Sequence, residues 1–248
     1  KEVNLTHDEW RKGLELLTRA GEMTDDERNE FVLFSDVLGL SSLVDMINSP
    51  EGATNSSVLG PFHILGAPEM AVGGDMIGDN PGPQVAVEGY VRAPSGAPVE
   101  GAVIELWQTA DNGLYSNQDP QQPDYNLRIS MKTGADGRYA LTTIRPAPYL
   151  VPTDGPVGDL LNATGRHAWR PSHLHFIVQA EGYRTLVTEV FPSDDPYLDA
   201  DAVFGVRSDL VMDYSPGNRA DLADDFVAKD RLADGFSKVD FDFVLASA

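Results

Sequence analysis

Apolar residues in the first 50 positions recur at helical spacing. Residues 6–9 read Thr-His-Asp-Glu, a capping-box pattern, and the apolar positions of a helix follow until Gly21. Residues 24–27 repeat the capping pattern before a second apolar run at 31–38, and a third short run spans 41–47. Helices this short cannot bury their apolar faces alone, so we expect them to pack on the rest of the chain or on another subunit.

Beyond Pro50 the pattern changes to the alternation that is typical of β-strands. Glycine and proline become frequent, and turn signals such as Asp111-Asn112-Gly113 separate the alternating segments. The chain is therefore predicted to be mainly β, with an antiparallel β-sandwich domain over residues 56–248 and an α-helical dimerisation or linker segment over residues 1–55. The expected strands are 85–91, 102–109, 138–144, 176–179, 185–191 and 239–245.

Composition and charge narrow the classes of partner. The 248 residues include 39 acidic and 18 basic side chains, for a formal net charge of −21, and so acidic a chain argues against binding to nucleic acid. The absence of cysteine excludes disulfides, thiolate metal sites and a cysteine nucleophile. No apolar run approaches the roughly 20 residues that cross a bilayer, and no signal-peptide pattern opens the chain. We therefore expect a cytoplasmic protein without a membrane span.

Two histidines lie one residue apart in the segment Arg170-Pro-Ser-His173-Leu-His175. The apolar, β-prone residues that follow predict a strand, and a strand places His173 and His175 on the same face. Two imidazoles on one face form half of a metal site, and Arg170 could hold an anion beside the metal. The structural alternative is a pair of ordinary polar residues on a half-exposed strand.

Two tyrosines in long loops could supply the other half. Tyr149 lies in the loop over residues 145–170, where prolines at 146, 148, 152 and 156 fix the backbone on both sides of it. Tyr115 lies in the loop over residues 111–127. A tyrosine held in this way is either a packing anchor or a placed phenol, and the residues by themselves leave both interpretations open.

Together these motifs resemble the intradiol ring-cleavage dioxygenases. The resemblance rests on Pro148-Tyr-x-Val-Pro-x-Asp-Gly-Pro-Val-Gly158, on Gly165-Arg-His167 and on Arg170-Pro-x-His-x-His-Phe176, and it covers nearly the whole chain. It implies a non-haem Fe(III) ion, a hard cation that favours anionic oxygen donors and therefore suits two phenolates. The implied ligands are Tyr115, Tyr149, His173 and His175.

The resemblance also implies roles for individual residues. Tyr149 would leave the metal and take up a substrate proton, and Arg170 would stabilise negative charge that develops near the ring. Both are thus expected to be catalytic. The implied substrate pocket comprises Leu33, Asp36, Val58, Leu59, Gly60, Pro61, Phe62, Val151, Pro152, Arg170, Glu189, Ala202 and Val203.

Three segments, at residues 31–43, 57–62 and 197–206, look closer to hydroxyquinol 1,2-dioxygenases than to catechol enzymes. The implied reaction cleaves 1,2,4-trihydroxybenzene between its ortho hydroxyls with O2, giving 3-hydroxy-cis,cis-muconate/maleylacetate. Asp36 could accept a hydrogen bond from the third hydroxyl, or it could be an ordinary surface or helix residue. Two other functions stay open: cleavage of catechol or a substituted catechol to a cis,cis-muconate, and a non-catalytic β-sandwich binding protein.

Glu189 departs from the family pattern, since catechol-cleaving relatives carry an uncharged glutamine at that position. An inward, ionised Glu189 would change the charge around the metal. Protonation, pairing with Arg170 and an outward orientation are the alternatives. The resemblance further implies a homodimer through the N-terminal helices, with an apolar channel that can hold a phospholipid.

Overall fold

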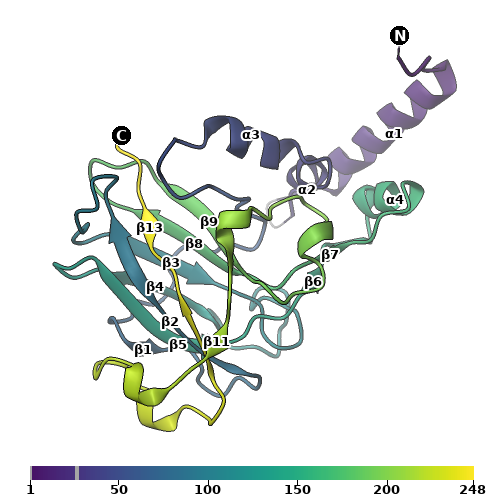
Figure 1. The fold of residues 1–248 in the computed structure, drawn as a ribbon. Coiled ribbons are helices and arrows are strands. Elements are labelled where there is room, and N and C mark those ends of the chain that lie inside the picture. The colour runs from purple at the N-terminus through teal and green to yellow at the C-terminus, as the bar shows by residue number, and fades with distance from the viewer. Residues whose placement is uncertain (1, 26–27) are drawn as a thin grey trace.

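The computed structural model describes residues 2–25 and 28–248 (Figure 1). Three helices open the chain, as predicted: α1 (His7–Met23), α2 (Glu30–Val37) and α3 (Leu40–Asn48). The first capping box forms between Thr6 and Glu9. In Figure 1, α1 extends away from the sheets, with the N-terminus at its far end.

The second predicted capping box is not the start of α2. The N-cap of α2 is Asn29, whose side chain accepts a hydrogen bond from the backbone N–H of Val32. Thr24 instead follows the last turn of α1, where its hydroxyl donates to the carbonyl oxygen of Ala20. Asp26 and Glu27, the other two residues of that prediction, lie outside the described residues.

The rest of the chain forms β-sheets, as expected, but these sheets are mixed and not purely antiparallel. A six-stranded sheet has the order β1-β5-β2-β12-β11, with β13 also paired to β2, and a five-stranded sheet has the order β10-β9-β8-β3-β4. Antiparallel pairs form the centre of the five-stranded sheet. The parallel pairs are β1 with β5, β10 with β9, and both β12 and β13 with β2. The strands are β1 (Gly74–Asp75), β2 (Gln84–Arg92), β3 (Val103–Trp107), β4 (Arg128–Lys132), β5 (Arg138–Ile144), β6 (Tyr149–Leu150), β7 (Trp169–Arg170), β8 (Leu174–Gln179), β9 (Leu186–Pro192), β10 (Val211–Met212), β11 (Ser215–Pro216), β12 (Ser237–Asp240) and β13 (Phe243–Val244).

Two predicted segments differ from the structure. The expected long loop over residues 145–170 contains the small β6–β7 sheet and the helix α4 (Pro156–Ala163). The expected last strand is divided into β12 and β13. Between them, the carbonyl oxygen of Phe241 accepts a hydrogen bond from the Tyr139 hydroxyl at 2.6 Å. This carbonyl also lies 1.8 Å from where a Cβ on Gly89 would be, so the position admits glycine alone.

The two large sheets share one hydrophobic core, to which β2, β5, β12 and β13 contribute from one side and β3, β4, β8 and β9 from the other. The opposite face of the five-stranded sheet carries a second apolar cluster. There Trp107 and Ile177 of the sheet meet Leu33 and Val37 of α2. The candidate site lies in this second cluster.

The remaining elements are short. Short 3-10 helices lie between the late strands. They are η1 (Leu198–Ala200), η2 (Ser208–Leu210), η3 (Arg219–Asp221) and η4 (Lys229–Arg231). Among the described residues, every helix is too short or too polar to span a membrane.

Candidate metal and substrate site

The candidate site is built on one row of residues that are paired across neighbouring strands of the five-stranded sheet. From β4 to β9, Arg128 pairs with Trp107, Trp107 with His175, and His175 with Glu189. Residues that pair across neighbouring strands point to the same face of a sheet. Phe176, the next residue of β8, points to the opposite face and is buried in the main core.

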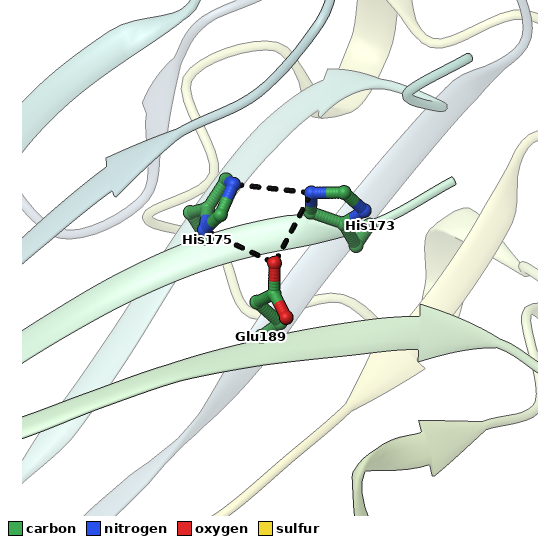
Figure 2. A group of neighbouring side chains, drawn as sticks. All are labelled: His173, His175 and Glu189. Atoms are coloured by element: carbon green, nitrogen blue, oxygen red, sulfur yellow. Dashed lines mark hydrogen bonds and ion pairs between the residues drawn. The ribbon is translucent and has the colours of Figure 1, made fainter. Parts of the chain in front are cut away.

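His173 and His175 point toward each other, as the strand pattern predicts (Figure 2). Their Nε2 atoms lie 3.0 Å apart, about the separation of two donors that bind one ion at right angles with bonds of about 2.1 Å. Nδ1 of His173 lies 2.7 Å from the carbonyl oxygen of Pro171 and donates to it, which leaves the Nε2 lone pair free. The Trp107 ring stacks on His175, with 4.6 Å between ring centroids.

Both imidazoles are held in the neutral form. Burial, together with the positive charge of Arg170, lowers the pKa of His173 to about 4. Burial and the neighbouring His173 lower the pKa of His175 well below its ordinary value. A neutral imidazole has a lone pair for a metal ion, so two nitrogen ligands are ready at neutral pH.

Two buried phenols lie beside the imidazoles. Tyr115 Oη is 3.4 Å from His173 Nε2, and the Tyr149 ring lies 5.4 Å from the Tyr115 ring and 5.6 Å from the His173 ring, centroid to centroid. Burial raises the pKa of Tyr149, and burial together with Tyr149 raises the pKa of Tyr115 further. The phenols therefore ionise only if a cation stabilises them, and a highly charged metal ion does so. Two imidazoles and two phenols that converge in this way fit a ferric ion.

Glu189 points inward, pairs with Arg170 and reaches the same group. Its Oε1 lies 3.3 Å from His173 Nε2 and 3.5 Å from His175 Nδ1 (Figure 2), and the three side chains could together hold a metal ion. Yet both Glu189 oxygens are occupied, because Arg170 donates to them at 2.7 and 3.0 Å and Ser57 Oγ lies 2.5 Å from Oε2. The phenol oxygens are less engaged, so we favour the tyrosines over Glu189 as ligands.

Arg170 is fully buried between two carboxylates. Besides Glu189 it contacts Asp201, with Nε 3.1 Å from Oδ1 and Nη2 3.2 Å from Oδ2. Burial opposes the charge, but Asp201 and Glu189 outweigh it and raise the pKa of Arg170. Burial likewise opposes ionisation of Glu189, and the charge of Arg170, with hydrogen bonds from Arg170 and Ser57, outweighs this and lowers its pKa. The small sheet places Arg170 directly opposite Tyr149, whose Oη is 3.4 Å from Nη1.

A narrow cavity of about 10 Å³ opens beside these groups, roughly the room of one water molecule, so the lining side chains have to separate to admit a larger ligand. All the residues that line it belong to the predicted site. Gly60 lies beside the His175 imidazole at φ +68°, in the left-handed region that favours glycine. The lining residues are Leu33, Asp36, Val58, Gly60, Pro61, Phe62, Tyr149, Val151, Pro152, Arg170 and Val203.

Three of the predicted pocket residues are absent from this lining as far as the structure describes it. Leu59 lines a wider groove outside the cavity. Glu189 lies behind Arg170, and Ala202 lines a separate hollow against α3 and η1. The structure also adds Ser57 and Asp201, which contact Glu189 and Arg170. Both residues lie in segments that resemble the hydroxyquinol enzymes, at 57–62 and 197–206, but no local pattern assigns them these contacts, because their partners are distant in the sequence.

Comparison with known proteins agrees with this geometry. The family model described as Dioxygenase matches residues 60–247, and that described as Catechol dioxygenase N terminus matches residues 1–56. A hydroxyquinol 1,2-dioxygenase of Rhizobium sp. (strain MTP-10005) is 48% identical, with 99% of this chain and 83% of the relative covered. The solved hydroxyquinol 1,2-dioxygenase of Pseudomonas putida DLL-E4 is 46% identical at a TM-score of 0.91, covering 100% of this chain and 86% of that one.

A solved catechol 1,2-dioxygenase is more distant. That of Acinetobacter sp. ADP1 is 32% identical at a TM-score of 0.83, covering 99% of this chain and 80% of the other. The family matches and the full-length similarity lead to one conclusion: this chain belongs to the intradiol ring-cleavage dioxygenases.

Proposed function

We propose that this dioxygenase cleaves hydroxyquinol, 1,2,4-trihydroxybenzene, between its ortho hydroxyls. The observation that carries the proposal is Asp36, a carboxylate 4% exposed that lines the cavity beside the tyrosines and histidines. Burial raises the pKa of Asp36, and a hydrogen bond from Ser41 offsets this only in part. A third ring hydroxyl would give this carboxylate a further donor besides Ser41, whereas catechol would add none.

The similarity to named relatives points the same way. Relatives called hydroxyquinol 1,2-dioxygenase and 6-chlorohydroxyquinol 1,2-dioxygenase are 48% and 47% identical to this chain. A catechol 1,2-dioxygenase of Candida albicans is 35% identical. Intradiol enzymes use non-haem iron, and we propose Fe(III) as its form here, held by Tyr115, Tyr149, His173 and His175.

The residues of the site divide the work as follows. Bound ferric iron would act as a Lewis acid that withdraws electron density from the ring diolate and prepares it for O2. Tyr149 Oη, as a phenolate, accepts a proton from a substrate hydroxyl. Arg170 Nη1, aimed at Tyr149 Oη, stabilises negative charge that develops on the ring. The apolar walls, among them Val58, Phe62 and Val203, orient the ring and exclude water.

Steady-state O2 uptake with hydroxyquinol and with catechol tests the substrate assignment. We expect a higher kcat/KM for hydroxyquinol. A clear preference for catechol would refute the assignment and leave the reaction class intact. The metal assignment is tested separately by iron content and the visible tyrosinate-to-iron charge-transfer band, which Tyr115→Phe should weaken. Full iron loading without colour would contradict it.

We also propose a homodimer formed through the N-terminal helices. Apolar side chains of α1 and α3 are open to solvent, with Trp10 52%, Leu14 44% and Ile47 72% exposed. Such a surface is typical of an interface, and an apolar channel within it could hold a phospholipid. Size-exclusion chromatography with light scattering should give twice the mass of the chain, and lipid extraction followed by mass spectrometry tests the ligand. A monomer at micromolar concentration would refute the dimer.

A further inference from the structure

Hydrogen bonds fix the orientation of the Arg170 guanidinium. Of its five N–H donors, Nε and one on Nη2 go to Asp201, and the other on Nη2 and one on Nη1 go to Glu189. The remaining N–H on Nη1 faces the site, 3.4 Å from Tyr149 Oη and 3.3 Å from His173 Nε2. Glu189 accepts hydrogen bonds from one edge of the guanidinium plane and Asp201 from the other. The direction of the remaining Nη1–H therefore depends on both carboxylates.

Asp201 also fixes the turn that forms one wall of the cavity. Its Oδ1 accepts the backbone N–H of Val203 at 3.2 Å, and its Oδ2 accepts that of Gly205 at 2.9 Å. With the two bonds from Arg170, each oxygen of this buried carboxylate has two donors. Val203 lines the cavity next to Arg170. One side chain therefore ties the catalytic cation to the wall that touches the substrate.

We propose that Asp201 is a positioning residue for ring cleavage, which sets the direction of Arg170 Nη1 and the place of Val203 relative to the bound ring. The inference rests on the proposed catalytic role of Arg170. Asp201 touches neither the cavity nor the metal ligands, so its effect on catalysis passes through Arg170 and the turn over residues 201–205. Glu189 alone would let the guanidinium pivot about the edge that it holds.

Gly205 supports this assignment through an independent observation. A Cβ at this position would lie 2.8 Å from Arg170 Nη2, 2.8 Å from Glu189 Oε2 and 3.1 Å from Asp201 Oδ2. All three partners are buried and held by charge-assisted bonds, so none moves aside without disturbing the others. A side chain is excluded here by the arginine and its two carboxylates, not by the backbone angle of Gly205.

Asp201→Asn tests the proposal, with Asp199→Asn as the matched control. Asp199 is exposed in η1, which directly precedes the turn, so the control removes an equal charge two residues away. In the iron-loaded enzyme we expect Asp201→Asn to lower kcat about 10- to 100-fold, the scale of a misdirected catalytic group, and to change KM much less. In the metal-free protein, the Nε–H resonance of Arg170, assigned with Arg170→Lys, should lose its protection from exchange in Asp201→Asn only.

Gly205→Ala separates geometry from charge, since it disturbs the arginine and leaves all charges in place. We expect it to lower kcat in the same direction as Asp201→Asn. If both variants lose thermal stability but keep the wild-type kcat below their melting temperature and keep the Nε–H protected, Asp201 only stabilises the fold and the proposal is wrong. An inactive wild-type enzyme, or an Arg170→Lys variant with full activity, would instead refute the proposed function on which this inference rests.

Discussion

Replacing Asp36 gives the sharpest test of substrate selection. Asp36 lies on α2, is 4% exposed and lines the cavity. Asp36→Asn keeps the shape and removes the charge, whereas Asp36→Leu removes both the charge and the hydrogen-bonding atoms at similar volume. We expect both changes to act on hydroxyquinol and to leave catechol turnover nearly unchanged or improved.

The expected loss of kcat/KM depends on whether residue 36 offers the third hydroxyl a charged acceptor, a neutral acceptor or none. A hydrogen bond between a hydroxyl and a charged acceptor contributes about 1.5–3 kcal/mol, and one to a neutral acceptor about 0.5–1.5 kcal/mol. At about 1.4 kcal/mol per tenfold, Asp36→Asn should lower kcat/KM for hydroxyquinol roughly 5- to 10-fold, and Asp36→Leu roughly 10- to 150-fold. Catechol makes no such bond, so the preference ratio falls by similar factors.

The pH dependence carries a definite sign. Burial raises the pKa of Asp36, so the ionised fraction, and with it the hydroxyquinol preference, should increase as pH rises through that pKa. In Asp36→Asn the preference should be flat over the same range.

Stopped oxygen-electrode assays with both substrates, from pH 5.5 to 8, measure these quantities. Asp45→Asn is the matched control, because Asp45 lies on α3 and lines the outer groove with Asp36 but not the cavity. A loss of kcat/KM that is equal for hydroxyquinol and catechol would show that Asp36 holds the helix in place and does not read the third hydroxyl.

Three further predictions concern stability and the metal centre. Burial raises the pKa of Asp45 to about 6, so its contribution to stability is present at pH 4 and lost as pH rises through 6. A pKa shift of this size corresponds to about 3 kcal/mol of stability for a fully buried group. Asp45 is partly exposed, so solvent screening reduces this contribution. Asp45→Asn should therefore raise the free energy of unfolding by about 1 kcal/mol at pH 7.5 and by nothing at pH 4, measured with urea. Tyr139→Phe removes the bond to Phe241 and should cost about 1–1.5 kcal/mol, and an unchanged urea midpoint would contradict this. Burial raises the pKa of Tyr115 and Tyr149, and the charge of Glu189 adds to the rise, so Glu189→Gln should move the pH midpoint of iron uptake, followed by the visible band, to lower pH. An equal or higher midpoint would be inconsistent with an ionised Glu189.

The sequence by itself determined the local features of the protein. The alternation expected of a strand predicts His173 and His175 on one face, because side chains in a strand repeat every two residues. In the structure β8 begins at Leu174, and His173, just before it, still faces His175. The same reasoning locates β2, β5 and β9, whose observed bounds differ from those predicted by a residue or so. The motifs around Tyr149 and Arg170, through their resemblance to a family, named all the residues that line the cavity.

Only the tertiary structure decided how these pieces meet. Glu189 faces His175 because β8 and β9 pair in one register, and a slip of one residue would turn it to the other face. Asp201 reaches Arg170 across 31 residues of chain, and Ser57 reaches Glu189 across 132. Contacts over such separations leave no periodic mark in the sequence. The proposed ligands therefore rest on local pattern and resemblance, whereas the carboxylates that hold Arg170 depend on strand register and on packing between distant segments.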